Sequence, residues 1–178
     1  GFFTTTNGVS SPSLVRFDAN GVRDTSFAPA VAAGKPIYFL RATAGGKYFV
    51  GHGSGGGLRR LNADGTLDTT FNAPATIGGN LGGYVSAIRE LPDGKFIVAH
   101  TNGANGQGFT YYVQRLNADG TIDATFSSPA LSWDVTQLEL LPDGRIVIGG
   151  RFATVAGQPR QCLAVLNADG TLAPSFPF

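Results

Sequence analysis

The chain has 178 residues, of which 42% are hydrophobic and 14% charged, a composition that belongs to a folded domain and excludes an intrinsically disordered one. Its 13 Lys and Arg residues and 12 Asp and Glu residues are scattered along the sequence and give a net charge of +1. Because there is no basic stripe and no apolar run of roughly 20 residues, we expect no nucleic-acid partner and no membrane insertion.

The first recognisable element is a phrase that occurs four times along the chain. It reads FDANGVRDTSF in residues 17–27 and returns as LNADGTLDTTF, LNADGTIDATF and LNADGTLAPSF in residues 61–71, 116–126 and 166–176. The phenylalanines that close it are 44, 55 and 50 positions apart. A period of about 50 residues is typical of a repeat architecture, in which each repeat is one supersecondary unit.

A second phrase lies between successive copies of the first, in residues 37–50, 85–98 and 135–148. Both phrases contain a turn, because glycine follows Pro-Asp in the second phrase and Asn-Ala-Asp in the first, and glycine accepts the positive φ that closes a short hairpin. Short β-branched and aromatic runs flank each turn and predict four strands in each unit. The turn glycines that we expect to anchor the repeat are Gly65, Gly94, Gly120, Gly144 and Gly170.

The repeat predicts an all-β fold without helices, made of β-propeller blades that are four-stranded antiparallel meanders of about 50 residues. We expect three complete blades, residues 31–75, 79–128 and 131–178, and one partial blade, residues 1–28, that lacks its first strand. An isolated blade leaves its faces open, so neighbouring blades must stack. The inter-blade contacts that we expect are Phe27, Phe71, Phe126 and Phe176.

These phrases resemble the delta-60 repeats of the DUF5122-type bacterial β-propeller family, which read LNxDGTLDxTF and LPDGKILVGG. The resemblance covers nearly the whole chain and is most specific in residues 116–126 and 140–150. It departs in one unit at residues 44–46, where Ala-Gly-Gly replaces Pro-Asp-Gly, and in the last unit at residues 173–174, where Ala-Pro replaces Asp-Thr. The resemblance implies a propeller and brings no agreed catalytic residues.

The alignment of residues 1–3 with residues 150–152 indicates that the chain begins at the second strand of a blade. Three alternatives follow: the chain is a piece of a longer propeller, copies of it associate, or its blades stack in an open array. We therefore expect its partners to include further blades, either from the same longer chain or from other copies.

Two local patterns resemble ligand sites and have structural explanations. Residues 51–56 contain GxGxxG, but another strand follows and offers no helix N-terminus to a phosphate, so we expect a hairpin loop. Residues 62–68 resemble half of a calcium loop, but Ala73 stands where the bidentate acid is needed, so we expect a capped turn. The side chains that bond the local backbone in such turns are Asp24, Asp68 and Asp123.

His52 and His100 occupy the same place in adjacent units, just after the second strand. A metal would need three or four ligands, and Gly150 is the counterpart in the last unit, so we expect solvated strand ends and no metal site. The chain has 2 His and 1 Cys, which leaves little material for a nucleophile with its base. We expect no catalytic residues, no cofactor and no enzymatic activity.

The candidates for ligand binding lie in or beside the connections that precede a first strand. They are Tyr84, Trp133, Asp134 and Asn80. Such loops gather at one end of a propeller, where an aromatic ring can stack on a sugar or anchor a protein. The alternative is that these rings pack against the neighbouring blade.

We expect a non-catalytic propeller module for protein or glycan binding in an exported bacterial protein, located outside the cell, at its surface or in the periplasm. The absence of Met and the 26 Gly favour export. Two alternatives stay open: a structural module that completes a ring or an array by oligomerisation, and a non-catalytic part of a larger enzyme.

Overall fold

The computed structural model of the chain describes residues 5–6, 9–10, 13–31, 36–53, 56–79, 82–104 and 108–174. Within these ranges the regular structure is entirely β, which confirms the all-β class, and it includes no helix that could cross a membrane. The strands are β1 (Thr5–Thr6), β2 (Val9–Ser10), β3 (Ile37–Ala42), β4 (Tyr48–His52), β5 (Leu58–Leu61), β6 (Tyr84–Glu90), β7 (Phe96–Ala104), β8 (Gly108–Leu116), β9 (Val135–Leu140), β10 (Ile146–Gly150), β11 (Thr154–Val155), β12 (Gln158–Pro159) and β13 (Leu163–Leu166).

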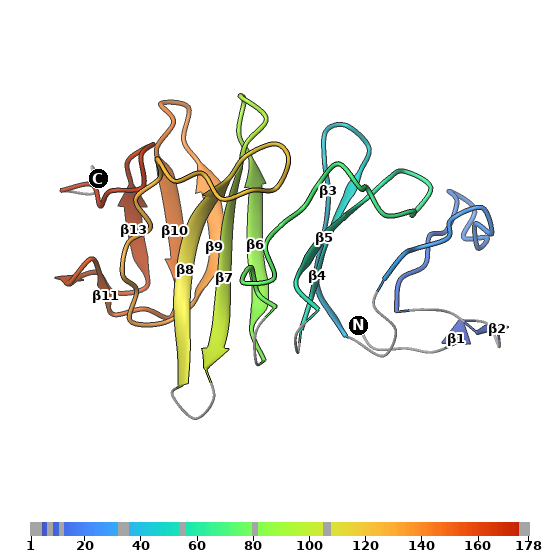
Figure 1. Cartoon of the computed structure of the whole chain (residues 1–178), viewed down its shortest axis with the longest axis horizontal. Coiled ribbons are helices and arrows are strands. Elements are labelled where there is room, and N and C mark those ends of the chain that lie inside the picture. Colours follow the sequence, from blue (N-terminus) through green and yellow to red (C-terminus); the bar gives the residue numbers. More distant parts are fainter. Residues whose placement is uncertain are drawn as a thin grey trace.

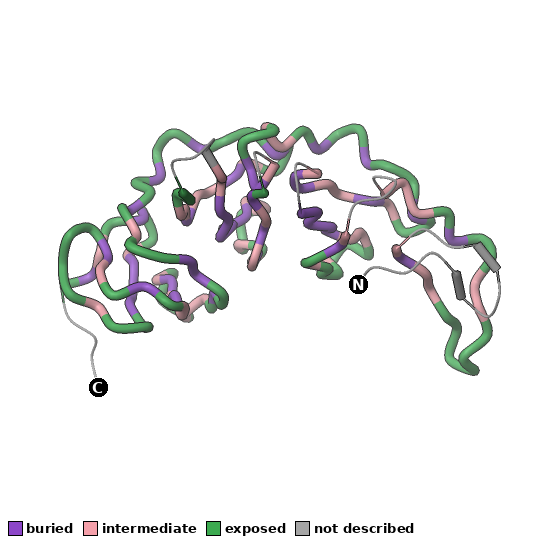
Figure 2. Tube along the Cα trace, turned by 90° about the horizontal axis from the view of Figure 1, so that it is seen from below, coloured by how far each residue is buried: buried purple, intermediate pink, exposed green. Residues whose placement is uncertain are grey.

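The longer strands form three antiparallel sheets, β3-β4-β5, β6-β7-β8 and β9-β10-β13. Figure 1 shows the sheets side by side, and Figure 2 shows that the chain follows an arc whose two ends bend toward the same side. The first strand of each sheet lies against the first strand of the next, β3 against β6 and β6 against β9. Two short ribbons, β1-β2 and β11-β12, complete the regular structure of the described ranges.

Each of these sheets has three strands and not the four that the repeat predicts. After the Asn-Ala-Asp-Gly turn the chain makes one bridge back to the third strand. The bridged pairs are Leu61 with Leu67, Leu116 with Ile122, and Leu166 with Leu172. In two of these units the chain then turns because Asp68 and Asp123 accept hydrogen bonds from the backbone N–H of Thr70 and Thr125, both at 3.0 Å. Asp24 accepts from the Ser26 N–H in the same way in the first unit, at 2.9 Å. The predicted fourth strand is thus a single bridge that, where the aspartate is present, leads into a capped turn.

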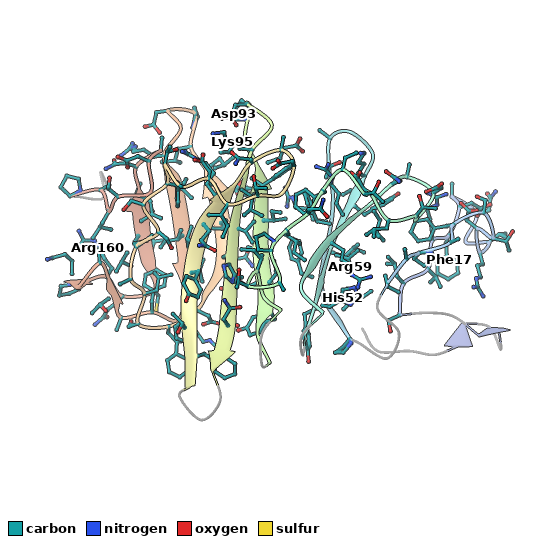
Figure 3. The ribbon with its side chains drawn as sticks, in the orientation of Figure 1. Phe17, His52, Arg59, Asp93, Lys95 and Arg160 are labelled. Atoms are coloured by element: carbon teal, nitrogen blue, oxygen red, sulfur yellow. The ribbon has the colours of Figure 1, made fainter. Side chains whose placement is uncertain are left out.

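The turns between strands depend on glycine. The five glycines expected as anchors have φ angles between 80° and 91°, a region that other residues rarely adopt. Gly65 donates its N–H to the Asn62 carbonyl at 2.9 Å, which closes the Asn-Ala-Asp-Gly turn. Gly46, with a φ of 75°, closes the equivalent of the Pro-Asp-Gly turn in the unit that lacks proline. We call the end of the sheets that carries these turns the turn end. It lies at the top of Figure 1, and Figure 3 labels Asp93 and Lys95 there.

The hydrophobic core lies between neighbouring sheets. Phe71 packs against Phe49 of β4 at a centroid distance of 5.2 Å and against Phe96 of β7 at 6.0 Å. Phe126 lies in the equivalent cluster between β6-β7-β8 and β9-β10-β13, where Ile97 and Ile148 are fully buried. Because apolar side chains of two sheets share each cluster, a single sheet would leave them exposed to water.

The first and last copies of the repeat are described in part. Phe27 packs edge-on against Tyr48 of the following unit at 5.8 Å. Phe176 and residues 1–3, which carried the prediction of a second strand at the start, lie outside the described residues. The expected boundaries at residues 28–31, 75–79 and 128–131 fall in the connections between successive units.

Backbone contacts at the turn end join each unit to the next. Asn72 donates its N–H to the Asp119 carbonyl at 2.7 Å, and Ser127 donates to the Asp169 carbonyl at 2.7 Å. These bonds bring the two backbone segments so close that a Cβ on Gly120 would lie 2.9 Å from the Ala73 nitrogen. The glycine of the Asn-Ala-Asp-Gly turn therefore serves the turn and the junction together.

An arginine crosses the same junction. Arg115 donates from Nε to the Asp123 carboxylate at 2.7 Å and from Nη1 to the Ala168 carbonyl of the following unit at 2.9 Å. Lys95 Nζ also donates to Asp123 at 2.8 Å, and the carboxylate is 6% exposed. Hydrogen bonds from Lys95 and from Thr125 hold the pKa of Asp123 well below its usual range. Asp123 is therefore ionised in the folded protein and forms ion pairs with both Lys95 and Arg115.

Candidate functional site

The end of the sheets opposite the turn end, which we call the loop end, carries the candidate site. Here β7 and β8 have 9 residues each, whereas β4 and β10 have 5 and β5 and β13 have 4. The β7-β8 hairpin therefore reaches beyond the neighbouring sheets at the bottom of Figure 1. Side chains of this longer sheet therefore contact the residues directly before β9.

Three side chains form a row across the base of this hairpin. Tyr84 of β6 pairs with Thr101 of β7, and Thr101 pairs with Tyr111 of β8. Directly opposite residues of antiparallel strands point to the same face of a sheet, so the two tyrosines share one face. That face meets the unit of β9, because both tyrosines contact residues immediately before this strand.

Asp134, directly before β9, is the buried anion of the site, with its side chain 2% exposed. Tyr84 Oη donates to its Oδ2 at 2.8 Å, and Arg151 donates from Nε to Oδ1 at 2.8 Å and from Nη2 to Oδ2 at 2.7 Å. The Arg151 guanidinium, followed by the Tyr84 hydroxyl, holds the pKa of Asp134 below its usual range against the effect of burial. The carboxylate is ionised and accepts three strong hydrogen bonds.

The backbone places Arg151 beside Asp134. The Arg151 N–H donates to the Asp134 carbonyl at 3.0 Å, directly after a register shift in the pairing of β9 and β10 at residues 149–150. A Cβ on Gly150 would lie 2.2 Å from the Asp134 carbonyl oxygen. Glycine at this position therefore lets the two chains approach closely enough for the side chains to form a two-point ion pair.

Aromatic rings surround this ion pair. Trp133 stacks on Tyr111 with ring centroids 5.6 Å apart and an interplanar angle of 23°. Trp133 is 48% exposed, and Phe109, two residues before Tyr111 on the same face of β8, is 51% exposed. Burial, followed by the charge of Asp134, raises the pKa of Tyr111, so this phenol is neutral at ordinary pH. We call Tyr84, Tyr111, Trp133, Asp134 and Arg151 the Trp133 cluster.

A pocket of about 500 Å³ adjoins the cluster and shares Tyr84 with it. Its other lining residues are Tyr38, Gly82, Val85, Ser86 and Thr136. Tyr38 is 65% exposed and meets Tyr84 edge-on at 6.3 Å, so the pocket has an aromatic corner. This volume falls in the range of pockets that hold small ligands.

The structure brings together three of the four residues that the sequence singled out for binding: Tyr84, Trp133 and Asp134. The fourth, Asn80, lies outside the described residues. We had expected Asp134 to contact a ligand directly. Its side chain is instead buried and already hydrogen-bonded to Tyr84 and Arg151. Arg151 was not among the predicted site residues, although its charge stands where the preceding units have Gly53 and Thr101.

The histidines are buried, so the prediction of solvated strand ends was wrong. His52 is 0% exposed and His100 is 2% exposed. The His100 ring stacks on Tyr112 at 4.9 Å, its Nδ1 accepts the Gly78 N–H at 3.3 Å, and its Nε2 lies 2.8 Å from Gln114 Oε1. Burial lowers the pKa of His100 to about 4, so the ring is neutral at pH 7. Among the described residues no group of three His, Cys, Asp or Glu could hold a metal ion.

A family model described as a domain of unknown function (DUF5122) beta-propeller matches residues 1–27, 43–71, 91–126 and 141–176. Each matched segment ends at a closing phenylalanine of the repeat. The chain therefore belongs to the DUF5122 β-propeller family, which confirms the resemblance seen in its repeats.

Comparison with individual proteins adds little. No curated protein matches the chain. A solved structure of a protein of unknown function from Bacteroides caccae is 14% identical and aligns over 79% of this chain and 81% of its own, with a TM-score of 0.29. So distant a likeness carries no argument about this chain, and its function must be argued from its own residues.

Proposed function

We propose that the chain is a non-catalytic β-propeller module that binds a glycan or protein ligand at the loop end, as part of an exported bacterial protein. In this proposal each three-stranded sheet, with the bridge that follows it, is one blade. The ligand rests on the Trp133 cluster and enters the adjoining pocket.

The observation that carries this proposal is the exposure of aromatic rings at one end of the molecule. Tyr38, Phe109 and Trp133 are 65%, 51% and 48% exposed. Large apolar side chains gathered in this way are typical of binding surfaces, and aromatic rings supply much contact area at a low cost in side-chain entropy. The two-point ion pair between Arg151 and Asp134 holds in place the backbone next to Trp133.

A glycan suits this surface better than a flat protein interface. The Trp133 ring is half open and stacked on Tyr111, which holds it in one orientation. A rigid ring of this kind packs against the apolar face of a sugar, while the pocket beside Tyr84 is large enough for one or two sugar units. A protein ligand would instead bury the rings as anchors.

The test is binding of an oligosaccharide library and of peptides to the native chain, followed by titration with Trp133→Ala. We expect this variant to lose at least tenfold in affinity, the effect of removing one anchoring aromatic ring. Leu67→Ala is a matched control, since Leu67 is 42% exposed at the turn end. A ligand that binds Trp133→Ala as tightly as the native chain would exclude this site.

A second candidate function, self-assembly, is favoured by Phe17. This residue is 44% exposed, whereas Leu61, Leu116 and Leu166, its counterparts in the other units, are 0% exposed. Figure 3 labels Phe17 at the end of the arc beyond β3. Beside β3, a groove of about 300 Å³ is lined by residues 13–15 and 37–40. In the other units the equivalent leucine lies in a cluster that it shares with side chains of the preceding unit, so the occupant that we propose here is a unit of a second copy.

This candidate is tested by the mass of the protein in solution. A dimer or larger assembly that dissociates in Phe17→Ser, but not in the control Phe109→Ser, would support assembly through this face. A monomer at every accessible concentration would exclude it.

A further inference from the structure

Arg151 is the charged group of the Trp133 cluster that is open to a ligand. Its side chain is 65% exposed, whereas that of its partner Asp134 is 2% exposed. Nε and Nη2 are bonded to the carboxylate, and Nη1 has no hydrogen-bond partner among the described residues. The ion pair is therefore oriented, with its negative end buried and its positive end facing water.

The carboxylate of the cluster is already engaged, so the cluster offers no free negative charge to a ligand. The Asp134 oxygens accept three hydrogen bonds from Arg151 and Tyr84. The Tyr84 hydroxyl donates its hydrogen bond to this same carboxylate. A ligand that lies on this cluster meets an N–H donor with a positive charge, so it must supply an acceptor, and a carboxylate is the acceptor that pairs best with guanidinium.

We propose, on the basis of the function proposed above, that the ligand is an acidic saccharide whose carboxylate pairs with Arg151 while its ring packs on Trp133. The chain supplies both parts of this recognition within one loop and the strand end beside it, because Trp133 and Asp134 are neighbours in sequence and Arg151 is bonded to Asp134. The Trp133 ring, held in one orientation by Tyr111, favours a saccharide with an apolar ring face over an acidic peptide.

The experiment titrates the native chain with oligogalacturonate and with the same oligomer as its methyl ester. The ester keeps the sugar rings and removes the charge, so it isolates the carboxylate. We expect the acid to bind roughly tenfold or more tightly than the ester, because a charge-assisted pair is replaced by a neutral contact, and we expect this preference to shrink as salt is raised.

The matching variant is the double substitution Asp134→Asn with Arg151→Gln, which avoids leaving a buried carboxylate alone. We expect it to bind acid and ester alike and at the ester's affinity. Arg145→Gln, at the turn end, is the control and should keep the preference of the native chain. Circular dichroism of each variant verifies that the fold is intact.

The outcomes separate this inference from the function on which it rests. Equal binding of acid and ester, lost in Trp133→Ala, would overturn the carboxylate inference and leave the glycan site standing. Binding of an acidic peptide through Arg151 without binding of either saccharide would overturn the saccharide class. If neither saccharide nor any peptide binds, the proposed function of the loop end fails together with the inference.

Discussion

At the turn end, neighbouring units repeat the same contacts, whereas at the loop end each unit places different side chains in equivalent positions. The residues at the start of the first strands are Pro36, Tyr84 and Asp134, and the residues opposite them at the second strands are Gly53, Thr101 and Arg151. At the turn end, by contrast, Arg60 and Arg115 make the same bonds to an aspartate of their own unit and to an alanine carbonyl of the next. Repeated contacts hold the units together, and unrepeated ones are free to form a site.

The last unit shows which contacts the junction requires. It has Val165 and Ala173 in the places of the arginine and aspartate, and the Ala173 N–H still donates to the Val165 carbonyl at 2.9 Å. The bridge between the third strand and the segment that follows therefore forms without the ion pair. The Arg-Asp pair serves the contact between units, and the backbone serves the unit itself.

The largest expected effect comes from a methyl group placed in a junction. Gly120 and Gly94 both have positive φ, 90° and 80°, but a Cβ on Gly120 would lie 2.9 Å from the Ala73 nitrogen, whereas nothing lies within 4 Å of a Cβ on Gly94. Alanine should cost about 1 kcal/mol at Gly94 for the backbone strain, and at least about 3 kcal/mol at Gly120, where the backbone of the next unit must move as well.

Urea unfolding of Gly120→Ala and Gly94→Ala measures this difference. If the two variants unfold with the same free energy, the junction is not closely packed and the distinction between turn and junction is lost.

Asp123→Ala should have the next largest effect, about 2 to 4 kcal/mol, because it leaves Arg115 and Lys95 without their shared buried carboxylate. The matched control is Asp93→Ala in an exposed turn, for which we expect about 0.5 kcal/mol. Thermal or urea unfolding of both variants provides the comparison. Equal losses would mean that the ion pair adds nothing beyond the local turn.

The repeated half of this comparison could be predicted from the sequence, and much of the other half could not. A turn glycine can be identified from the sequence because the positive φ is a local requirement of the turn, and the Asp-Gly dipeptide recurs in the repeated phrases. The reduction of the fourth strand to one bridge was not predicted, because the sequence shows that Asp68 and Asp123 favour capped turns but does not show that the turns begin directly after the bridge.

The Arg151–Asp134 pair was missed for a related reason. Their contact depends on the register shift at residues 149–150 and on the glycine that allows it, neither of which periodicity reveals. The burial of His52 and His100 was predicted wrongly because β4 and β7 continue past the predicted strand ends and include both histidines. The His100 ring then lies against Tyr112 and Gln114 of the third strand and against Gly78.

Lowering the pH tests the comparison between the turn end and the loop end, because their titratable groups change protonation state in different pH ranges. The pKa of His100, at the loop end, falls from 6.5 to about 4 on folding, so the unfolded chain binds the proton more readily. Its contribution is complete above about pH 6.5 and is lost as the pH falls toward 4, by about 3 kcal/mol. The carboxylates of the turn end, with lowered pKa values, contribute above about pH 4 and lose their effect only below it.

The measurement is the unfolding free energy of the native chain and of His100→Gln at pH 7 and at pH 4.5. We expect the native chain to lose more stability than the variant between these two values. Parallel losses would show that His100 is not the group that titrates there.

The smallest effect is expected for Tyr84→Phe, which removes the hydroxyl that donates to Asp134 and keeps the ring. Asp134 retains both bonds from Arg151, at 2.8 and 2.7 Å, so the loss of stability should be about 1 kcal/mol. Because Arg151 stays paired and Trp133 stays stacked on Tyr111, ligand affinity should change less than threefold. A larger loss of affinity without a matching loss of stability would mean that Tyr84 itself touches the ligand through the pocket that it shares with Tyr38. That result would move the centre of the site from the ion pair to the pocket.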